Sequence, residues 1–442
     1  METVLYIIQI YLLVAGCVKI KRNILDISGY LNILFVVFFA LPAWDLYYEW
    51  GTFSHIINRY DVYPTNEVVY RYIIISTVTA LLFDLGYTIG VKTKTSGNLG
   101  RKYLYNIECS DKFDSRIYCF ILFVLLFVWI AVIINEYRSY NGSLISFLLP
   151  SRKQNIKSGM EGTIQVLFPE MIISLVYIRR WNEKHILRYM IFPVLILLLS
   201  LSVGAQRRAM IQGIMYIAML FVIRHIQGGK KSKEAAEKKK HYFLFIFLGI
   251  AFVSLIPLLW YARSFSSQLS RGGEMVNPFS LHSFTDLIFG SSSTGFDSTM
   301  VFDWYDINYG IPFAHMIRYI ASFWLPRMIY PNKMMQITMM LKVARGDGGN
   351  ISLFYINDLY FSFRSLSVIT TPLIGFILSR AYFSAITKKK VSGLLIGLYM
   401  LSQIVLLFKN GVAAYATAVI TFTVVFKICL FLCNKRIRII PE

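Results

Sequence analysis

The stretch of sequence that decides the fold is IYCFILFVLLFVWIAVIIN, residues 117–135. It holds no Asp, Glu, Lys or Arg, and as a helix it would be roughly 28 Å long, close to the thickness of a bilayer's hydrocarbon core. Its apolar residues form one continuous run and not a stripe at helical spacing. The stretch therefore predicts a transmembrane helix, because a helix satisfies its own backbone hydrogen bonds in lipid.

Runs of the same kind recur along the whole chain. Its 442 residues are 56% hydrophobic and only 16% charged, which is typical of membrane proteins. We predict an all-α, polytopic integral membrane protein of about eleven transmembrane helices. They lie at residues 3–18, 31–48, 71–91, 117–135, 163–178, 189–203, 209–223, 242–261, 366–386, 391–408 and 412–433.

The predicted spans divide the chain into three parts. Residues 1–261 form an N-terminal membrane bundle of about eight helices, residues 262–365 a large extracytoplasmic loop, and residues 366–442 the last helices, about three. Loops of such length are usually functional. Within this one, Pro312 to Tyr330 is apolar enough to form short interfacial or re-entrant helices, with Trp324 and Tyr330 at headgroup level.

The net charge of +21 has to be placed against the membrane before it is taken as a sign of nucleic-acid binding. One set of alternate loops carries 26 of the 45 Lys and Arg residues, and the opposite set carries 17. By the positive-inside rule, the N-terminus faces outward and the C-terminus faces the cytoplasm. The sequence shows no P-loop, G-x-G-x-x-G or H-E-x-x-H motif, so a cytoplasmic nucleotide-using enzyme is not expected.

Seventeen basic residues on the outer side call for an explanation. Arg207 and Arg208 lie at the tip of a tight hairpin at the membrane boundary. An arginine guanidinium matches phosphate oxygens, so such a surface suits a lipid-linked pyrophosphate. Alternatively, the outer cations pair with outer acids, and the hairpin arginines only reach for the interface. Eight basic residues lie in the long loop: Arg263, Arg271, Arg318, Arg327, Lys333, Lys342, Arg345 and Arg364.

Three acidic residues fall inside predicted spans: Asp45, Asp84 and Glu170, the last directly after Pro169. Ionisable groups at such depth are functional candidates, and a proton-coupled transporter would use them. They do not recur at one depth, however, and Asp45 is close enough to a span end to reach the interface. The repeated halves usual in transporters are also not visible.

Three short pieces resemble the Wzy-type polymerases of bacterial surface polysaccharides. Gly204 to Arg208 is similar to that family's small-residue-then-Arg hairpin. FWLPRMIYPNK, residues 323–333, resembles its P-R-x-x-x-P-x-K stretch after the long loop. NDLYFSF, residues 357–363, resembles its acidic-x-Tyr-x-x-Phe segment at the entry to the next helix.

The resemblance implies a GT-C-like fold and a membrane glycosyltransferase of the bacterial cytoplasmic (inner) membrane, with its active site facing outward. The growing glycan would be transferred from polyprenyl (undecaprenyl) pyrophosphate onto the terminal sugar of a lipid-linked repeat unit. It implies neither cofactor nor metal, and a flippase and a chain-length regulator as partners; no nucleic acid is expected to bind.

Such a transfer needs charge neutralisation on the leaving pyrophosphate and a base beside the attacking hydroxyl. For the pyrophosphate we expect Arg207, Arg208 and Arg327, followed by Lys333, Arg263, Arg318 and Arg345. For the base we expect His315, Asp303 or Asp358. Arg318 follows His315 at helical spacing and would lower its pKa, which keeps the imidazole neutral; alternatively, His315 is a polar residue satisfied at an interface.

Two other functions stay open at this point. An O-antigen ligase needs the same external cations and long loop, and differs only in its acceptor. A lipid-linked oligosaccharide flippase or another transporter needs a polar path across the bilayer, for which Asp84 and Glu170 are the candidates.

Overall fold

The computed structural model describes residues 1–23, 25–50, 65–92, 113–139, 159–181, 207–228, 311–325, 354–387 and 390–434, together with 189, 191, 193–196, 329–330, 334–337 and 340. Across these residues the regular structure is helical, and the β pairing consists of an isolated bridge between Phe113 and Asn434. The described chain is therefore all-α, as predicted.

Seven of the described helices are long and apolar enough to cross a membrane: Glu2–Arg22, Ile27–Tyr48, Asn66–Lys92, Ser115–Asn135, Tyr355–Thr387, Val391–Phe408 and Asn410–Cys433. Each contains or closely matches one predicted span. The predicted spans at 163–178 and 209–223 also lie in helices, α8 (Gly159–Arg179) and α10 (Arg207–Gly228). Residues 189–203 are described only in part and 242–261 lie outside the described residues, so the count of eleven stays a prediction.

The outward faces of these helices are apolar. On α6 (Ser115–Ser139), Phe120, Phe123 and Phe127 are each more than 60% exposed. Ile7 on α1 (Glu2–Arg22) and Ile369 on α17 (Ser367–Thr387) are similarly exposed. Soluble proteins rarely leave such continuous apolar faces open to water, so the chain is embedded in a membrane.

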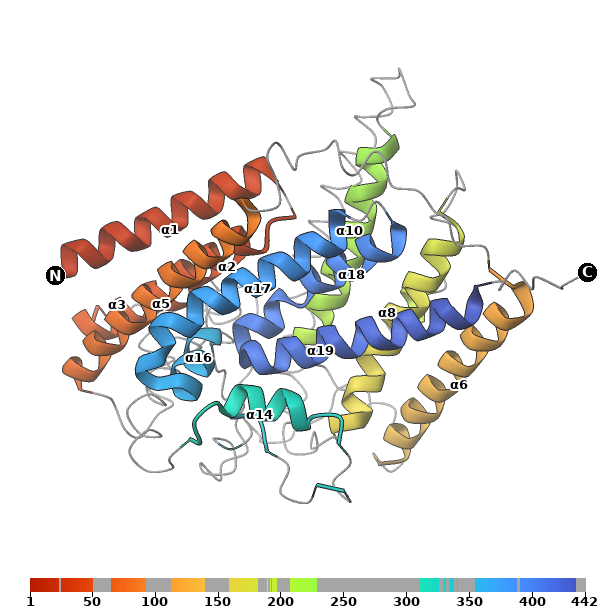
Figure 1. The fold of residues 1–442 in the computed structure, drawn as a ribbon. Coiled ribbons are helices and arrows are strands. Elements are labelled where there is room, and N and C mark those ends of the chain that lie inside the picture. The colour runs from red at the N-terminus through yellow and green to blue at the C-terminus, as the bar shows by residue number, and fades with distance from the viewer. Residues whose placement is uncertain are drawn as a thin grey trace, which may run out of the picture. The chain divides into compact units, whose positions relative to one another are not determined.

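The chain divides into two compact units, and the first, unit 1, consists of Met1–Gly100, Thr285–Ala385 and Gln403–Val419. In it α1 runs beside α2 (Ile27–Phe35), with Gly16 and Gly29 at their closest approach (Figure 1). A Cβ on Gly16 would lie 2.8 Å from the Gly29 carbonyl oxygen, so small residues are what allow this packing. The helix then continues through a π-helical turn, η1 (Val36–Ala40), into α3 (Leu41–Tyr48).

The centre of unit 1 is α5 (Asn66–Lys92). Gly86 of α5 and Gly375 of α17 lie where a Cβ would collide with the backbone of the other helix. On α5, Tyr72 donates a hydrogen bond to Asn357 of α16 (Tyr355–Phe363). The ring of Phe39, in η1, lies 5.2 Å from the rings of both Tyr72 and Phe354, so the π-helical turn packs against the start of α16.

The helical region that contains the predicted span at 366–386 begins at Tyr355, earlier than predicted. The apolar helix is preceded by α16 and by a short 3-10 turn, η5 (Arg364–Leu366), before α17. Arg364 has φ 52° and ψ −129°, a conformation that L residues rarely adopt, and it marks the break between the two helices. The end of the predicted external loop is therefore a buried helix in the core of unit 1.

The second unit, unit 2, consists of Arg101–Phe284, Ile386–Ser402 and Ile420–Glu442. It contains α6, α8, α10, α18 (Val391–Ser402) and the last part of α19 (Ile404–Cys433). At one end of α8, Arg179 donates to Ser115 of α6 at 3.1 Å and lies over the Tyr118 ring. The three-part division at 261 and 365 stays a prediction, because residues 262–310 lie outside the described chain.

Candidate functional site

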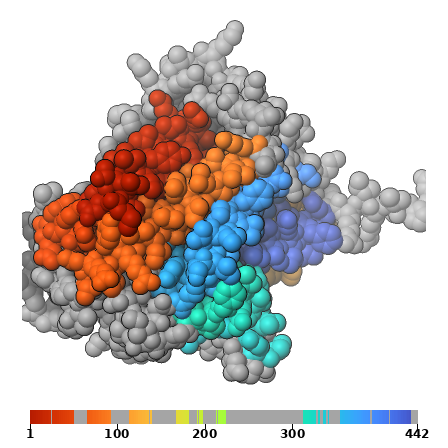
Figure 2. Space-filling model, turned by 60° about the vertical axis from the view of Figure 1, so that its left-hand side comes forward, coloured from red at the N-terminus to blue at the C-terminus, as the bar shows by residue number. Residues whose placement is uncertain are grey.

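The candidate site of unit 1 lies between α14 (His315–Ser322), α16 and the break in α19. The start of α14 is held by Ser362, whose carbonyl oxygen accepts from the Ala314 N–H at 2.7 Å and whose hydroxyl accepts from the Met316 N–H at 3.1 Å. Both bonds satisfy N–H groups that a helix start leaves open. In Figure 2, α14 (turquoise) lies beside the light-blue helices of the same unit.

His315 is the first residue of α14 and is buried, with 1% of its surface exposed. Among the described residues neither ring nitrogen forms a hydrogen bond of ordinary geometry, but the ring is in polar contact with the Met335 backbone, a contact that favours the protonated imidazole. Burial lowers the pKa of the imidazole, and the nearby Arg318 lowers it further against the opposing effect of the Met335 backbone. The ring is therefore neutral at pH 7, with one nitrogen able to accept a proton.

Tyr319 extends this cluster by one helical turn. Its ring lies nearly parallel to that of His315, with 6.5 Å between the centroids. Burial raises the pKa of Tyr319 to about 12, and the Asp358 carboxylate adds to the rise. The phenol therefore stays protonated and serves as a hydrogen-bond donor at neutral pH.

Asp358 holds the break in α19. Gly411 there has φ 86° and ψ 178°, a conformation open in practice only to glycine. Beyond the break the helix starts again, and the Asp358 carboxylate accepts from the Ala413 N–H at 2.8 Å. A carboxylate at a helix start both caps the free N–H groups and favours the positive end of the helix dipole. Asp358 thus has a structural role that its sequence position does not reveal.

The structure brings together three of the ten predicted site residues: His315 and Arg318 on α14, and Asp358 on the neighbouring α16. Arg318 is exposed, so it is free to meet a ligand from outside. Arg207 and Arg208 are the first two residues of α10 in unit 2. The other five lie outside the described residues: Asp303, Arg263, Arg327, Lys333 and Arg345.

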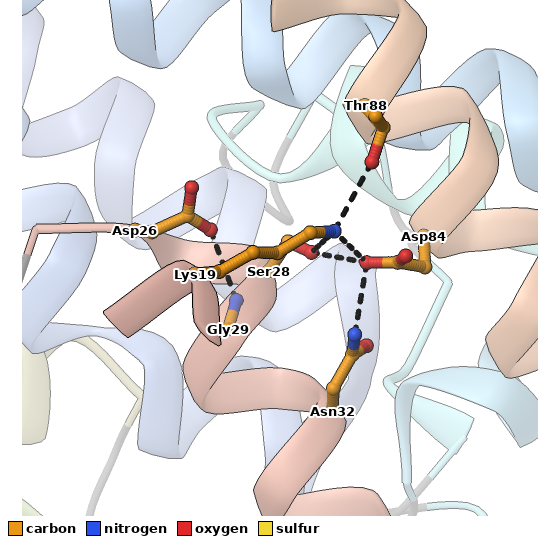
Figure 3. A network of polar contacts seen from close by, with 7 residues as sticks. All are labelled: Lys19, Asp26, Ser28, Gly29, Asn32, Asp84 and Thr88. Atoms are coloured by element: carbon orange, nitrogen blue, oxygen red, sulfur yellow. Dashed lines mark hydrogen bonds and ion pairs between the residues drawn. The ribbon is translucent and has the colours of Figure 1, made fainter. Parts of the chain in front are cut away.

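A second polar cluster in unit 1 joins α1, α2 and α5 around Asp84 (Figure 3). The Lys19 ammonium lies 2.5 Å from the Asp84 carboxylate and donates to the hydroxyls of Ser28 at 2.9 Å and Thr88 at 3.1 Å. Asp84 also accepts from Ser28 and, at 2.9 Å, from Asn32. The three N–H donors of the lysine thus meet three acceptors, and the cluster is closed.

Asp26 lies beside this cluster and caps α2, where its carboxylate accepts from the Gly29 N–H at 2.9 Å (Figure 3). Burial raises the pKa of Asp26, while that N–H and the charge of Lys19 lower it. Its role is that of a helix N-cap.

Sequence reasoning did not identify the partners of these groups. By its position after the first predicted span, Lys19 is expected to be one of the cytoplasmic flanking charges, yet it forms the ion pair with Asp84, 65 positions away. Ser362 and Gly411 were not expected to organise the candidate site. The Asn410-Gly411 pair is a typical helix breaker, and it was the one available signal.

No protein-family model, curated protein or solved structure matches the chain.

Proposed function

We propose that the chain is a membrane glycosyltransferase that polymerises the repeat units of a bacterial surface polysaccharide. In this proposal it has eleven spans and a GT-C-like fold, lies in the cytoplasmic membrane, and works at the outer face. The observation that carries it is His315: a buried, neutral imidazole whose nitrogens form no hydrogen bond of ordinary geometry with the described residues, one helical turn from an exposed arginine.

The chemistry requires a base for a sugar hydroxyl. As the hydroxyl oxygen forms its bond to the anomeric carbon of the growing chain, the imidazole of His315 accepts the hydroxyl proton. The bond from the anomeric carbon to the pyrophosphate oxygen breaks, and the electron pair leaves with the polyprenyl pyrophosphate. A neutral imidazole suits this step because a protonated ring has no lone pair to offer.

The leaving pyrophosphate needs positive charge. Arg318 is exposed on α14, one helical turn from the base. The rest of the proposed set is Arg207, Arg208, Arg327, Lys333, Arg263 and Arg345. Guanidinium groups keep their charge next to an apolar wall, which supports their use at a membrane surface.

Asp358 and Asp303 were the other base candidates. Because the Asp358 carboxylate is taken up by the helix start at Ala413, we assign Asp358 to positioning α16 and α19, and we assign the base role to His315. Asp303, outside the described residues, remains an alternative.

The test is deletion of the gene in the native host, followed by gel analysis of surface polysaccharide. The proposal predicts loss of long chains while single repeat units are still exported and attached. Long chains that remain on the lipid carrier would show an O-antigen ligase instead. Repeat units that stay on the cytoplasmic side would show a flippase, and either result would overturn the proposal.

A further inference from the structure

Glu170 of α8, in unit 2, is a buried acid that the proposed reaction does not use. None of its surface is exposed, and neither carboxyl oxygen has a hydrogen-bond partner in the described chain. The Asp84 carboxylate in unit 1 is also buried, but it forms an ion pair with Lys19 and accepts hydrogen bonds from Ser28 and Asn32. Of these two acids, only Asp84 has the partners that let a carboxylate stay ionised away from water.

The contacts between α8 and α10 place a second unpaired group at the same level. The Ser174 and Tyr216 hydroxyls lie 2.6 Å apart, and the Tyr177 hydroxyl donates to the Leu220 carbonyl at 3.4 Å. The two residues of the first pair are 42 positions apart in the sequence and those of the second pair are 43 apart. Because this separation is nearly constant, the two helices run parallel in a fixed register. The same offset sets Glu170 level with Gln212, whose Nε2 is buried and has no hydrogen-bond partner among the described residues.

The elements packed against α8 supply no opposite charge near Glu170 among the described side chains. The inward face of α6 carries Ile121 and Leu125, and its Tyr118 lies with Arg179 at the far end of α8. From α10 and α18 the titratable groups with described side chains are phenols, Tyr216 and Tyr399, whose rings are in contact; the side chains of the α10 residues Arg207, Arg208, Arg224 and His225 lie outside the description. Tyr177, on α8 itself, is also a phenol, so the described side chains around Glu170 are neutral.

We propose that Glu170 is a proton-binding site within unit 2, whose ligand is the proton itself. It holds the proton while α8 and α10 are packed together, because an unpaired carboxylate there would be far costlier than a carboxylic acid. When the helices part enough to admit water, the proton leaves and the Gln212 amide donates to the carboxylate. Gln212 is thus a positioning residue for the ionised form. This inference does not rest on the proposed polymerase function.

The test uses the full-length protein in membrane vesicles and an apolar carbodiimide, dicyclohexylcarbodiimide. This reagent needs a protonated carboxyl: the carboxyl oxygen adds to its central carbon, the proton goes to its nitrogen, and rearrangement leaves a stable acylurea. Peptide mapping by mass spectrometry then counts the product at each acid. Asp84, paired with Lys19, is the internal control.

We expect at least tenfold more product at Glu170 than at Asp84 at pH 6.5, with labelling of Glu170 falling as the pH is raised. Gln212→Leu removes the donor for the ionised form, so its labelling should persist to higher pH than in the wild type. Equal labelling of Glu170 and Asp84, or labelling of Glu170 that does not change with pH, would overturn the proposal.

Folding provides a second, independent readout. Glu170→Gln imitates the protonated acid in shape and charge, so its membrane abundance and unfolding temperature should match the wild type. If Glu170→Gln lost membrane abundance while Glu170→Asp kept the abundance of the wild type, an ionised carboxylate would be needed, and this would contradict the inference. Neither readout requires a sugar substrate, so a failure here is distinct from a failure of the proposed polymerase activity.

Discussion

The two polar clusters of unit 1 differ in how completely their groups are paired. Around Asp84, five side chains from three helices share hydrogen bonds, and the lysine uses all of its donors. Between α14 and α16, Ser362 satisfies the N–H groups of Ala314 and Met316, but within the described residues the imidazole of His315 forms no hydrogen bond of ordinary geometry. Buried polar groups are normally paired, so a closed network indicates a structural role, whereas an unpaired base indicates a site that waits for a ligand.

Breaking the closed cluster should have the largest effect on stability. Asp84→Ala leaves the Lys19 ammonium without its counter-charge, and removing one partner of a buried ion pair costs about 3–5 kcal/mol. Because the lysine side chain is 22% exposed, we expect the lower end of that range. Thermal unfolding in detergent measures the loss. The double variant Lys19→Met/Asp84→Ala should recover most of it; a double variant no more stable than Asp84→Ala would show that the charge pair is not the cause.

Straightening the break in α19 should be the next most damaging change. Gly411→Ala places a Cβ 2.7 Å from an Asp358 carboxylate oxygen, at a φ of 86°. Backbone strain of this kind costs about 1–3 kcal/mol. We expect lower thermal stability and, because Asp358 and α16 must shift, lower polymer yield. Unchanged stability would mean that the helix is not broken at this glycine.

Substitutions of Asp358 can distinguish the role of its charge from its role as a hydrogen-bond acceptor. Asp358→Asn keeps an oxygen for the Ala413 N–H, so it should cost little stability and retain activity. Asp358→Ala loses the cap and should cost about 1–2 kcal/mol. An Asn variant that is stable but inactive would instead assign Asp358 to the chemistry, and Asp358 would then no longer differ in role from His315.

The pH dependence provides the smallest and most specific test. Unfolded histidine has a pKa of about 6.5, and burial followed by Arg318 lowers that of folded His315. Below that pH the folded protein therefore binds fewer protons than the unfolded chain, and stability should fall as the pH drops below about 6.5.

The control for this pH dependence is Arg318→Gln, which removes the positive charge that lowers the pKa of His315. Because an exposed charge is screened, the loss of stability at low pH should become only slightly smaller. His315→Gln should abolish the contribution of this residue. Unfolding temperatures measured at stepwise lower pH report both effects. An identical fall in His315→Gln would place its origin elsewhere.

How far the sequence predicts this structure depends on the kind of element. Long apolar runs are sufficient for helices, because lipid leaves the backbone no other partner, and the helix at Ser115–Ser139 needed nothing more. α16 was missed because it is short and contains Asn357 and Asp358, which lower its hydropathy. These two polar side chains are buried with hydrogen-bond partners, Tyr72 and Ala413, that are far away in the sequence.

The same reason limits prediction of the candidate site. His315 and Asp358 were recognised by residue type, but the pairing that separates a cap from a candidate base is a long-range property. The acids inside spans show it as well: Asp84 has its lysine, whereas Glu170 has no partner in the described part of the chain, a difference that neither hydropathy nor spacing reveals.

The central claim is that the unpaired imidazole of His315 does chemistry while the closed cluster only supports the fold. The direct measurement is polymer length on gels from a deletion strain carrying His315→Gln, with membrane abundance followed in parallel. The matched control is Ser322→Ala, a buried residue of the same helix whose hydroxyl donates to the Tyr319 carbonyl. Loss of a general base predicts elongation reduced by about 10²–10⁴-fold in His315→Gln at normal abundance, with Ser322→Ala unaffected. Wild-type chain lengths in His315→Gln would contradict the account.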